Sequence, residues 1–232
     1  MRRWLLIVLA AAAACGGNSQ TKADQGRSIA EQAGLPKEVT DFFALAASGT
    51  TATYRSTIET TDANGKPLQV TTTQRPPDRR FDTFHADGTI DSTISVGGRS
   101  YQCAMAANHW DCGELARKPS TDSEVFGPTA VQGAIDGFRS RANDYDFRVD
   151  DQKLAGVAAR CLTTTRKAGH EQDPSLGASA RLCVSPEGAI VLVEVPSGSV
   201  AATEYTTSIP SNAFDLPAPV SSASSSAATT VN

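Results

Sequence analysis

The spacing of apolar residues predicts two amphipathic helices. In residues 36–47 apolar side chains recur at i, i+3, i+4 and i+7, which places them on one helical face. They are Val39, Phe42, Phe43 and Ala46. Pro36 suits the first turn of this helix, because an amide hydrogen at that position would have no helical partner. A second apolar stripe, in residues 128–142, predicts another helix.

Outside these helices apolar and polar residues alternate, which is typical of strands with one solvent-facing side. Asn64-Gly65 and other turn signals separate the alternating runs, so neighbouring strands are expected to pair in antiparallel meanders. We expect about six strands in residues 50–115 and about five in residues 145–207. The later ones are 145–154, 157–165, 180–184, 189–195 and 200–207. The predicted fold class is therefore α+β, with an antiparallel sheet of about 11 strands in two meanders.

One predicted strand breaks the alternation. Ile190-Val191-Leu192-Val193 is apolar at every position, as expected for a strand that is covered on both faces. A helix on one face and a loop on the other is the ordinary explanation. A helix on one face and an apolar cavity on the other is the alternative, and the sequence leaves both open.

The N-terminus has the three parts of an export signal. Arg2 and Arg3 precede an apolar stretch from residue 4 to about residue 11, and small residues follow it. The stretch is shorter than the ~20 apolar residues that span a bilayer. The three alanines before Cys15 resemble the lipobox of bacterial lipoproteins, although that family usually has Leu at the position of Ala12. The resemblance implies removal of residues 1–14 and a diacylglycerol thioether on Cys15. The protein would then be anchored by lipid on the extracytoplasmic face of the cell membrane or envelope.

The cysteine count fits that interpretation. Five cysteines leave at least one unpaired in an exported protein, and lipidation of Cys15 leaves four. They are Cys103, Cys112, Cys161 and Cys183. These four allow three disulfide connectivities, of which we favour first with second and third with fourth, because each pair would join neighbouring predicted strands. A zinc site formed by His109 and the first two cysteines is the alternative, but its spacing matches no common structural zinc pattern.

The net charge of the chain argues against some classes of binding partner. The full chain has 21 basic and 25 acidic residues, a formal charge of −4. Removal of residues 1–14, which hold Arg2 and Arg3 and no acidic residue, leaves 19 basic residues and a charge near −6. A mildly acidic surface argues against nucleic acid and against electrostatic attraction to anionic head groups. Membrane attachment would therefore depend on the acyl chains, at about 0.8 kcal/mol per buried methylene.

No enzyme signature is present. The chain has no G-x-S-x-G elbow, no H-E-x-x-H, no Walker loop and no G-x-G-x-x-G. Its three histidines fall in predicted turns or loops, and the aspartates of residues 144–151 lack the spacing and glycine of a calcium loop. We therefore predict a protein that is not an enzyme and that has no metal and no cofactor.

The order of helix, meander, helix and meander behind a lipidated cysteine resembles the LolA-like lipoprotein carriers and the LppX and LprG lipoproteins. The stretches that carry the local likeness are Ala52-Thr-Tyr54, Gln74-Arg-Pro-Pro77, Arg80-Phe-Asp82, Tyr101-Gln-Cys103, Trp110-Asp-Cys112, Cys183-Val-Ser-Pro-Glu-Gly188 and Phe214-Asp-Leu-Pro217. The resemblance covers about residues 37–217. It implies a strongly curved sheet, a half-barrel, with helices across its concave face. The expected organisation is a tether at 15–35, the half-barrel at 36–217 and a disordered Ser-rich tail at 218–232.

Two functional hypotheses remain. Relatives hold acyl chains between sheet and helices, so the first hypothesis is a lipoprotein that binds or carries a lipid or small apolar ligand. Strand parity then nominates five cavity residues: Tyr54, Ile58, Val70, Ile94 and Leu192. The second hypothesis is an interaction or structural lipoprotein with a solid core, which docks a protein partner in the envelope.

Overall fold

The computed structural model describes residues 19–61, 65–115, 142–170, 177–196 and 198–221. Within these ranges it has two α-helices, one 3-10 helix and eleven strands. The helices are α2 (Ser19–Gln32), α3 (Lys37–Ser48) and the 3-10 helix η1 (Gly49–Thr51). The strands are β1 (Tyr54–Thr61), β2 (Pro67–Arg75), β3 (Asp78–His85), β4 (Ile90–Val96), β5 (Arg99–Ala106), β6 (His109–Glu114), β7 (Tyr145–Leu154), β8 (Val157–Arg166), β9 (Ser179–Val184), β10 (Ile190–Val195) and β11 (Gly198–Thr206).

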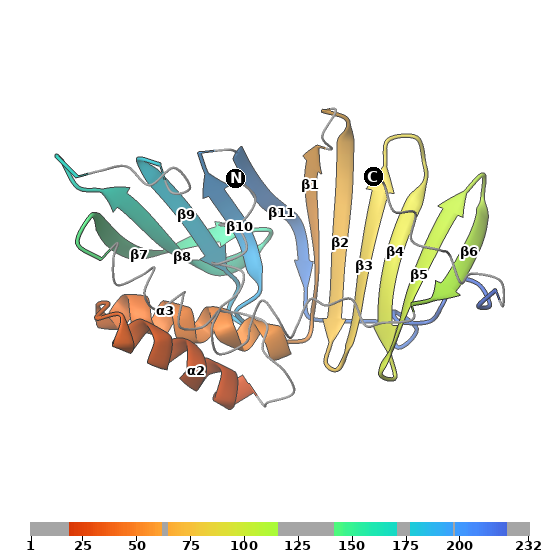
Figure 1. Cartoon of the computed structure of the whole chain (residues 1–232), viewed down its shortest axis with the longest axis horizontal. Helices are drawn as coiled ribbons and strands as arrows, with labels where there is room; N and C mark the ends of the chain where they lie inside the picture. The colour runs from red at the N-terminus through yellow and green to blue at the C-terminus, as the bar shows by residue number, and fades with distance from the viewer. Residues whose placement is uncertain (1–18, 62–64, 116–141, 171–176, 197, 222–232) are drawn as a thin grey trace, which may run out of the picture.

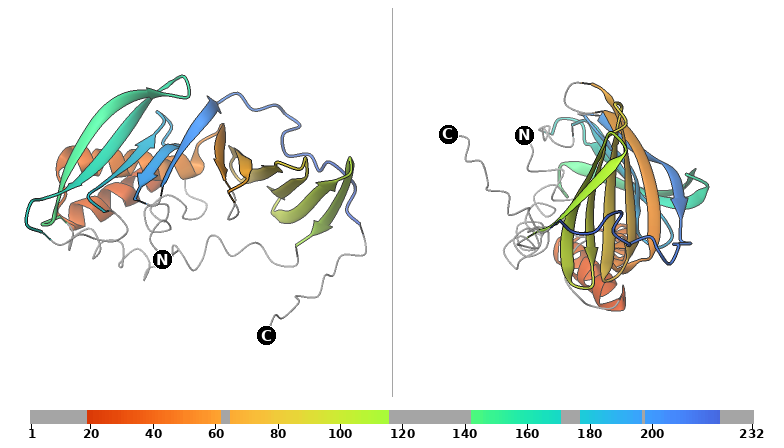
Figure 2. Two further views of the ribbon diagram at one scale, coloured as in Figure 1. Left: turned by 90° about the horizontal axis from the view of Figure 1, so that it is seen from above. Right: turned by 90° about the vertical axis from the view of Figure 1, so that its right-hand side faces the viewer.

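All of these strands form one open sheet. Its order is β6-β5-β4-β3-β2-β1-β11-β10-β9-β8-β7, and every neighbouring pair is antiparallel. Each meander contributes one half, and β1 joins β11 where the halves meet (Figure 1). The sheet is strongly twisted and curved, with β6 and β7 at its two ends (Figure 2). The predicted α+β class with an antiparallel half-barrel sheet is confirmed.

The helix predicted at 36–47 is confirmed as α3, but the tether predicted at 15–35 is wrong from residue 19 onward. Residues 19–32 form α2, which packs along α3 (Figure 1). Small residues allow the close approach. A Cβ on Gly26 would lie 2.5 Å from the carbonyl oxygen of Phe43, and Ala30 is fully buried. The many polar residues of α2 resemble a linker in composition. Its packing against α3 shows that the folded part begins before residue 36.

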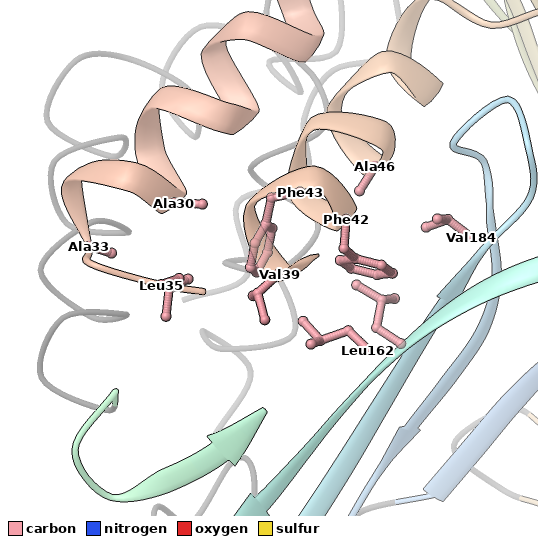
Figure 3. Packing of buried hydrophobic residues seen from close by; sticks show 10 residues of the cluster. Ala30, Ala33, Leu35, Val39, Phe42, Phe43, Ala46, Leu162 and Val184 are labelled. Carbon is pink, nitrogen blue, oxygen red and sulfur yellow. The ribbon is translucent and has the colours of Figure 1, made fainter. Parts of the chain in front are cut away.

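The main hydrophobic core joins the helices to the β7–β10 half of the sheet. Phe42 and Val39 of α3 are fully buried, and they face Leu162 of β8 and Val184 of β9 (Figure 3). Fully burying a side chain of this size contributes about 1.5–3 kcal/mol. This cluster fixes the helices on one face of the strands.

A second cluster lies on the other face of the same strands. Successive residues of a strand point to opposite faces, so Cys161 turns away from the helices that its neighbour Leu162 contacts. The disulfide Cys161–Cys183 is fully buried in this second cluster. The run at 190–193 serves both clusters: its first and last residues pack on the helix side, and its two middle residues pack around the disulfide. The prediction that this strand is covered on both faces is confirmed.

A third cluster stabilises the β1–β6 half. Ile94 is fully buried beside the disulfide Cys103–Cys112, which joins directly opposed residues of β5 and β6. Leu216 and Ala218 pack against this cluster. Both disulfides therefore have the connectivity favoured from the sequence.

Residues 207–221, here called the C-terminal strap, cross from β11 to β6 (Figure 2). Phe214 of the strap is buried beneath Arg75, whose guanidinium carbon lies 5.0 Å from the ring centroid. Val220 forms an isolated parallel bridge with Cys112, and the amide of Ser221 donates to the Cys112 carbonyl at 2.9 Å. The predicted disordered tail at 218–232 is therefore wrong for residues 218–221, which pair with the edge of the sheet.

Several predictions concern residues outside the described ranges. They include the export signal and Cys15, and nearly all of the helix predicted at 128–142. Among the described helices, none is both long and apolar enough to cross a membrane.

Candidate functional site

The five predicted cavity residues do not line one space. Ile58 and Leu192 pack around the Cys161–Cys183 disulfide, and Val70 lies opposite Ile58 in the β1–β2 ladder. Ile94 lies elsewhere, in the cluster of the other disulfide. It pairs with Arg80, which pairs with Thr73. Since Thr73 and Val70 are three residues apart on one strand, Ile94 lies on the opposite face of the sheet from Val70.

The fifth residue, Tyr54, stacks on Tyr205. Their ring centroids are 6.0 Å apart, with 17° between the ring planes. Burial raises the pKa of Tyr54 above its usual value. Tyr205 also packs against the second cluster, so Tyr54 extends a packed core.

The hydroxyl of Tyr205 belongs to a polar network at the β9–β10 turn. It donates to the Glu187 carboxylate at 2.7 Å and accepts from the fully buried Ser185 hydroxyl at 2.9 Å. Burial is the main cause that raises the pKa of Tyr205 well above its usual range, and Glu187 adds to it. A Cβ on Gly188 of this turn would lie 2.0 Å from the carbonyl oxygen of Leu45, so the turn packs directly on the end of α3. The network thus holds a turn against a helix.

A concavity of about 470 Å³ lies among the described residues, and its lining is mostly polar. It lies on strands β7 to β10. The lining residues are Arg148, Asp150, Thr163, Thr165, Ser179, Ala180, Arg181 and Glu194. One row of directly paired residues crosses all four strands, in the order Arg148, Thr163, Arg181 and Glu194. The next row along the strands contains Asp150 and the Cys161–Cys183 disulfide, which cross-links β8 and β9 beside the polar row.

Asp150 links the two arginines of this concavity. Its carboxylate accepts from Arg148 at 2.8 Å and from Arg181 at 3.3 Å. The hydrogen bond from Arg148, together with the charge of Arg181, lowers the pKa of Asp150 below its usual value. Two guanidiniums face two carboxylates, so the surface is charged and balanced. Such a lining suits a polar partner and does not suit an acyl chain.

Two of the three histidines lie beside aspartates. The His85 ring lies 2.9 Å from Asp91, and the His170 ring lies 2.9 Å from Asp144. In the part of the chain that the structure describes, no group of three or more His, Cys, Asp or Glu residues is arranged to hold a metal ion. Among the aspartates near residue 150, Asp146 and Asp150 form ion pairs with lysine and arginine respectively, and Asp144 contacts the His170 ring.

Sequence reasoning missed Arg148, Arg181 and Glu194. Each occupies a polar position of an alternating strand, which looks like any solvent-facing position. Their alignment in one row depends on the registers of three strand pairs. The only signal available from the sequence was the excess of charged residues at 146–153 in a chain otherwise rich in Thr, Ser and Ala.

Comparisons with known proteins locate no family. No protein-family model matches the chain, and no curated protein matches it. The crystal structure of MucB aligns with a TM-score of 0.48 and 16% identity, covering 79% of this chain and 64% of MucB. An uncharacterized conserved protein from Thermus thermophilus aligns with a TM-score of 0.39 and 10% identity, covering 76% of this chain and 91% of that protein. This chain therefore spans less than two thirds of the MucB chain.

The class of the protein follows from its own residues. Two buried disulfides join neighbouring strands on the two halves of the sheet. Disulfides persist in oxidising compartments and are rare in the cytosol. The chain is thus an extracytoplasmic α+β protein with one open, sheet-rich fold.

Proposed function

We propose that this protein is a lipid-anchored interaction protein of the cell envelope, not an enzyme, which docks a protein partner on its surface. The main observation in support is that the predicted cavity residues lie on both faces of the sheet. Ile58 and Leu192 belong to one packed cluster, and Ile94 belongs to another on the opposite face of the sheet. A concavity of the described residues is lined mainly by charged and hydroxyl side chains. Among the two hypotheses from the sequence, this supports the interaction protein over the lipid carrier.

The free energy of binding at this concavity is expected to differ between an acyl chain and a protein partner. An acyl chain gains about 0.8 kcal/mol for each methylene that leaves water, but it gains this only against apolar walls. Against Arg148, Arg181, Asp150 and Glu194 it would remove water from charged groups and offer them no hydrogen bonds. The polar side chains and backbone of a protein partner can replace those lost hydrogen bonds.

The cysteine pairing supports the lipid anchor. The four cysteines other than Cys15 form two disulfides with one another, so the fold uses none of them to pair with Cys15. An exported protein with one remaining thiol needs another use for it, and acylation at the lipobox-like position is such a use. Two acyl chains suffice for stable anchoring where one is marginal.

Lipid extraction tests the proposal. The chain from residue 15, carrying Cys15→Ser and expressed behind a cleavable export signal without a lipobox, would be purified without detergent and extracted with organic solvent for mass spectrometry. We expect no stoichiometric acyl lipid, and no shift of the thermal midpoint when lipid vesicles are added. Recovery of about one acyl lipid per chain, or a clear lipid-dependent rise in the midpoint, would overturn the interaction function and restore the carrier hypothesis.

A further inference from the structure

The two edge strands of the sheet differ in whether another segment of the described chain pairs with them. At β6 the C-terminal strap supplies a partner, since Val220 bridges Cys112 and Ser221 donates to its carbonyl. At β7, a ten-residue strand, no strand of the described residues pairs with the outer edge (Figure 1). A long unpaired edge presents amide and carbonyl groups to any other strand that fits.

The backbone geometry shows which groups β7 offers. The Lys167 amide donates to the Asp144 carbonyl at 2.9 Å, just before the β7–β8 ladder begins. Backbone groups alternate in direction along an antiparallel strand, so even-numbered residues of β7 turn theirs toward β8. Phe147, Val149 and Asp151 consequently turn their amide and carbonyl groups toward the outer edge.

The charged side chains of β7 are complementary to those of a second, antiparallel β7. Arg148 and Asp150 are neighbours on the face of β7 that bears the polar concavity. The Arg148 side chain is exposed, and the Asp150 side chain is partly buried. If β7 pairs antiparallel with another β7 around a twofold axis at Val149, Arg148 lies directly opposite Asp150 of the partner subunit, and the reverse pair forms as well. Phe147 lies opposite Asp151 of the partner subunit, and the outward backbone groups meet in hydrogen-bonded positions.

Neighbouring registers are disfavoured by the same charges. Centring the axis on Arg148 places the two arginines opposite each other, and centring it on Asp150 places the two aspartates opposite each other. Like charges directly opposite destabilise a strand pair. Moving the centre by one residue also turns the outward backbone groups out of hydrogen-bonded positions. Of these three registers, only the one centred on Val149 both places the outward backbone groups in hydrogen-bonded positions and pairs opposite charges.

We infer that the protein partner is a second copy of this chain, bound through antiparallel β7–β7 pairing centred on Val149. This rests on the proposed interaction function, because it names the partner of that function. Val149 is partly buried against the helix-side core, so pairing would place the two Val149 side chains next to each other at the edge of that core. The two sheets would join into one, with a row of alternating charges along the seam.

A charge-swap experiment tests the inference. Chains from residue 15 with Cys15→Ser would be compared by sedimentation equilibrium. The parent is expected to dimerise, while Arg148→Glu and Asp150→Arg are each expected to weaken self-association at least tenfold, since each places like charges opposite. Mixed together, the two variants should form heterodimers, because each contact across the axis then joins an acidic and a basic side chain again. Arg99→Glu, which alters an exposed ion pair with Glu114 on the other half of the sheet, is the matched control and should dimerise normally.

Backbone variants supply an independent readout. Asp151→Pro removes an amide that points outward and should abolish the dimer without unfolding the chain, because proline is tolerated on an edge. Gln152→Pro removes an amide directed toward β8 and should lower stability instead. A parent that stays monomeric at all concentrations, or a dimer indifferent to both charge swaps, would overturn the inference. Either outcome leaves the lipid-extraction test untouched, so failure of the dimer is distinguishable from failure of the interaction function.

Discussion

The side-chain carbonyl of Gln74 accepts two hydrogen bonds from the guanidinium of Arg79, at 2.6 and 3.0 Å. Gln74 is only 2% exposed, and its amide nitrogen lies 2.8–3.0 Å from three backbone carbonyls. Those carbonyls belong to Gly49, Thr50 and Ala52, between α3 and β1. One buried amide therefore ties the β2–β3 hairpin to the segment that leads from the helices into the sheet.

Replacing this amide should be costly. We expect Gln74→Ala to lower the free energy of unfolding by about 2–4 kcal/mol, because it leaves buried carbonyls and the Arg79 guanidinium without their partner. Urea unfolding of the leaderless chain would measure it. Gln102→Ala is the matched control: Gln102 accepts one exposed hydrogen bond from Thr93, and its loss should cost under about 0.5 kcal/mol. Equal effects of the two variants would contradict the role of Gln74.

The elements that sequence could predict are those with a local signal. The strands and α3 follow from periodicity and turns, because each pattern is complete within one short segment. Helix α2 was missed because it buries small residues such as Ala30 and Gly26, which give no strong apolar stripe. The favoured disulfide pairing could be found locally too, since Cys103 and Cys161 each have their partner on the neighbouring strand.

The candidate site could not be predicted in the same way. Strand parity separates two faces within one strand, but it does not say which face of one strand continues on the next. Ile94 and Val70 were assigned to one cavity for this reason, although the registers through β3 place them on opposite faces. Arg181 and Glu194 become neighbours only through the β9–β10 pairing, which contains a register shift. Long-range register is the missing information.

We predict that the stability of the fold falls at alkaline pH because of the Tyr205 hydroxyl. Burial raises its pKa above the value near 10 that it has in an unfolded chain, so the fold favours the protonated form. The stability contributed by that preference is fully present below pH 10 and is lost as the pH rises toward the higher folded pKa. Tyr205→Phe should be less stable than the parent at pH 8, because it loses the bonds to Ser185 and Glu187. Its stability should fall less steeply between pH 10 and 12, and parallel curves would contradict this.

The two disulfides should differ in their contributions. In the chain-entropy description a cross-link stabilises more when it closes a longer loop. The Cys161–Cys183 bridge spans 22 residues and Cys103–Cys112 spans 9. Paired replacement by alanine should therefore cost roughly 3 kcal/mol in each case, with the larger loss at Cys161 and Cys183. Denaturant unfolding of the two double variants measures the order, and a reversal of that order would show that local packing dominates over loop closure.

The C-terminal strap should protect the β6 edge. Arg80 donates to strap carbonyls of Ala213 and Asp215 at 3.4 Å, and Leu216 covers the cluster around Ile94. Ending the chain before residue 213 would uncover that cluster and free the β6 edge, so we expect lower stability and aggregation on storage. Light scattering and thermal unfolding would report both. A chain that ends after Ser221 keeps every one of these contacts and serves as the control, with behaviour like that of the parent.

The anchor prediction separates the thiol of Cys15 from the four that form disulfides. Expressed with its leader, the parent chain should fractionate with membranes and release a peptide carrying diacylglycerol on Cys15. Cys15→Ser should leave the membrane fraction, because the acidic chain has no electrostatic attraction to anionic lipid that could replace about two acyl chains. Fold stability should be unchanged, since both disulfides remain. A parent chain whose intact mass shows an unmodified Cys15, or a Cys15→Ser chain that stays on the membrane, would contradict lipid anchoring at this residue.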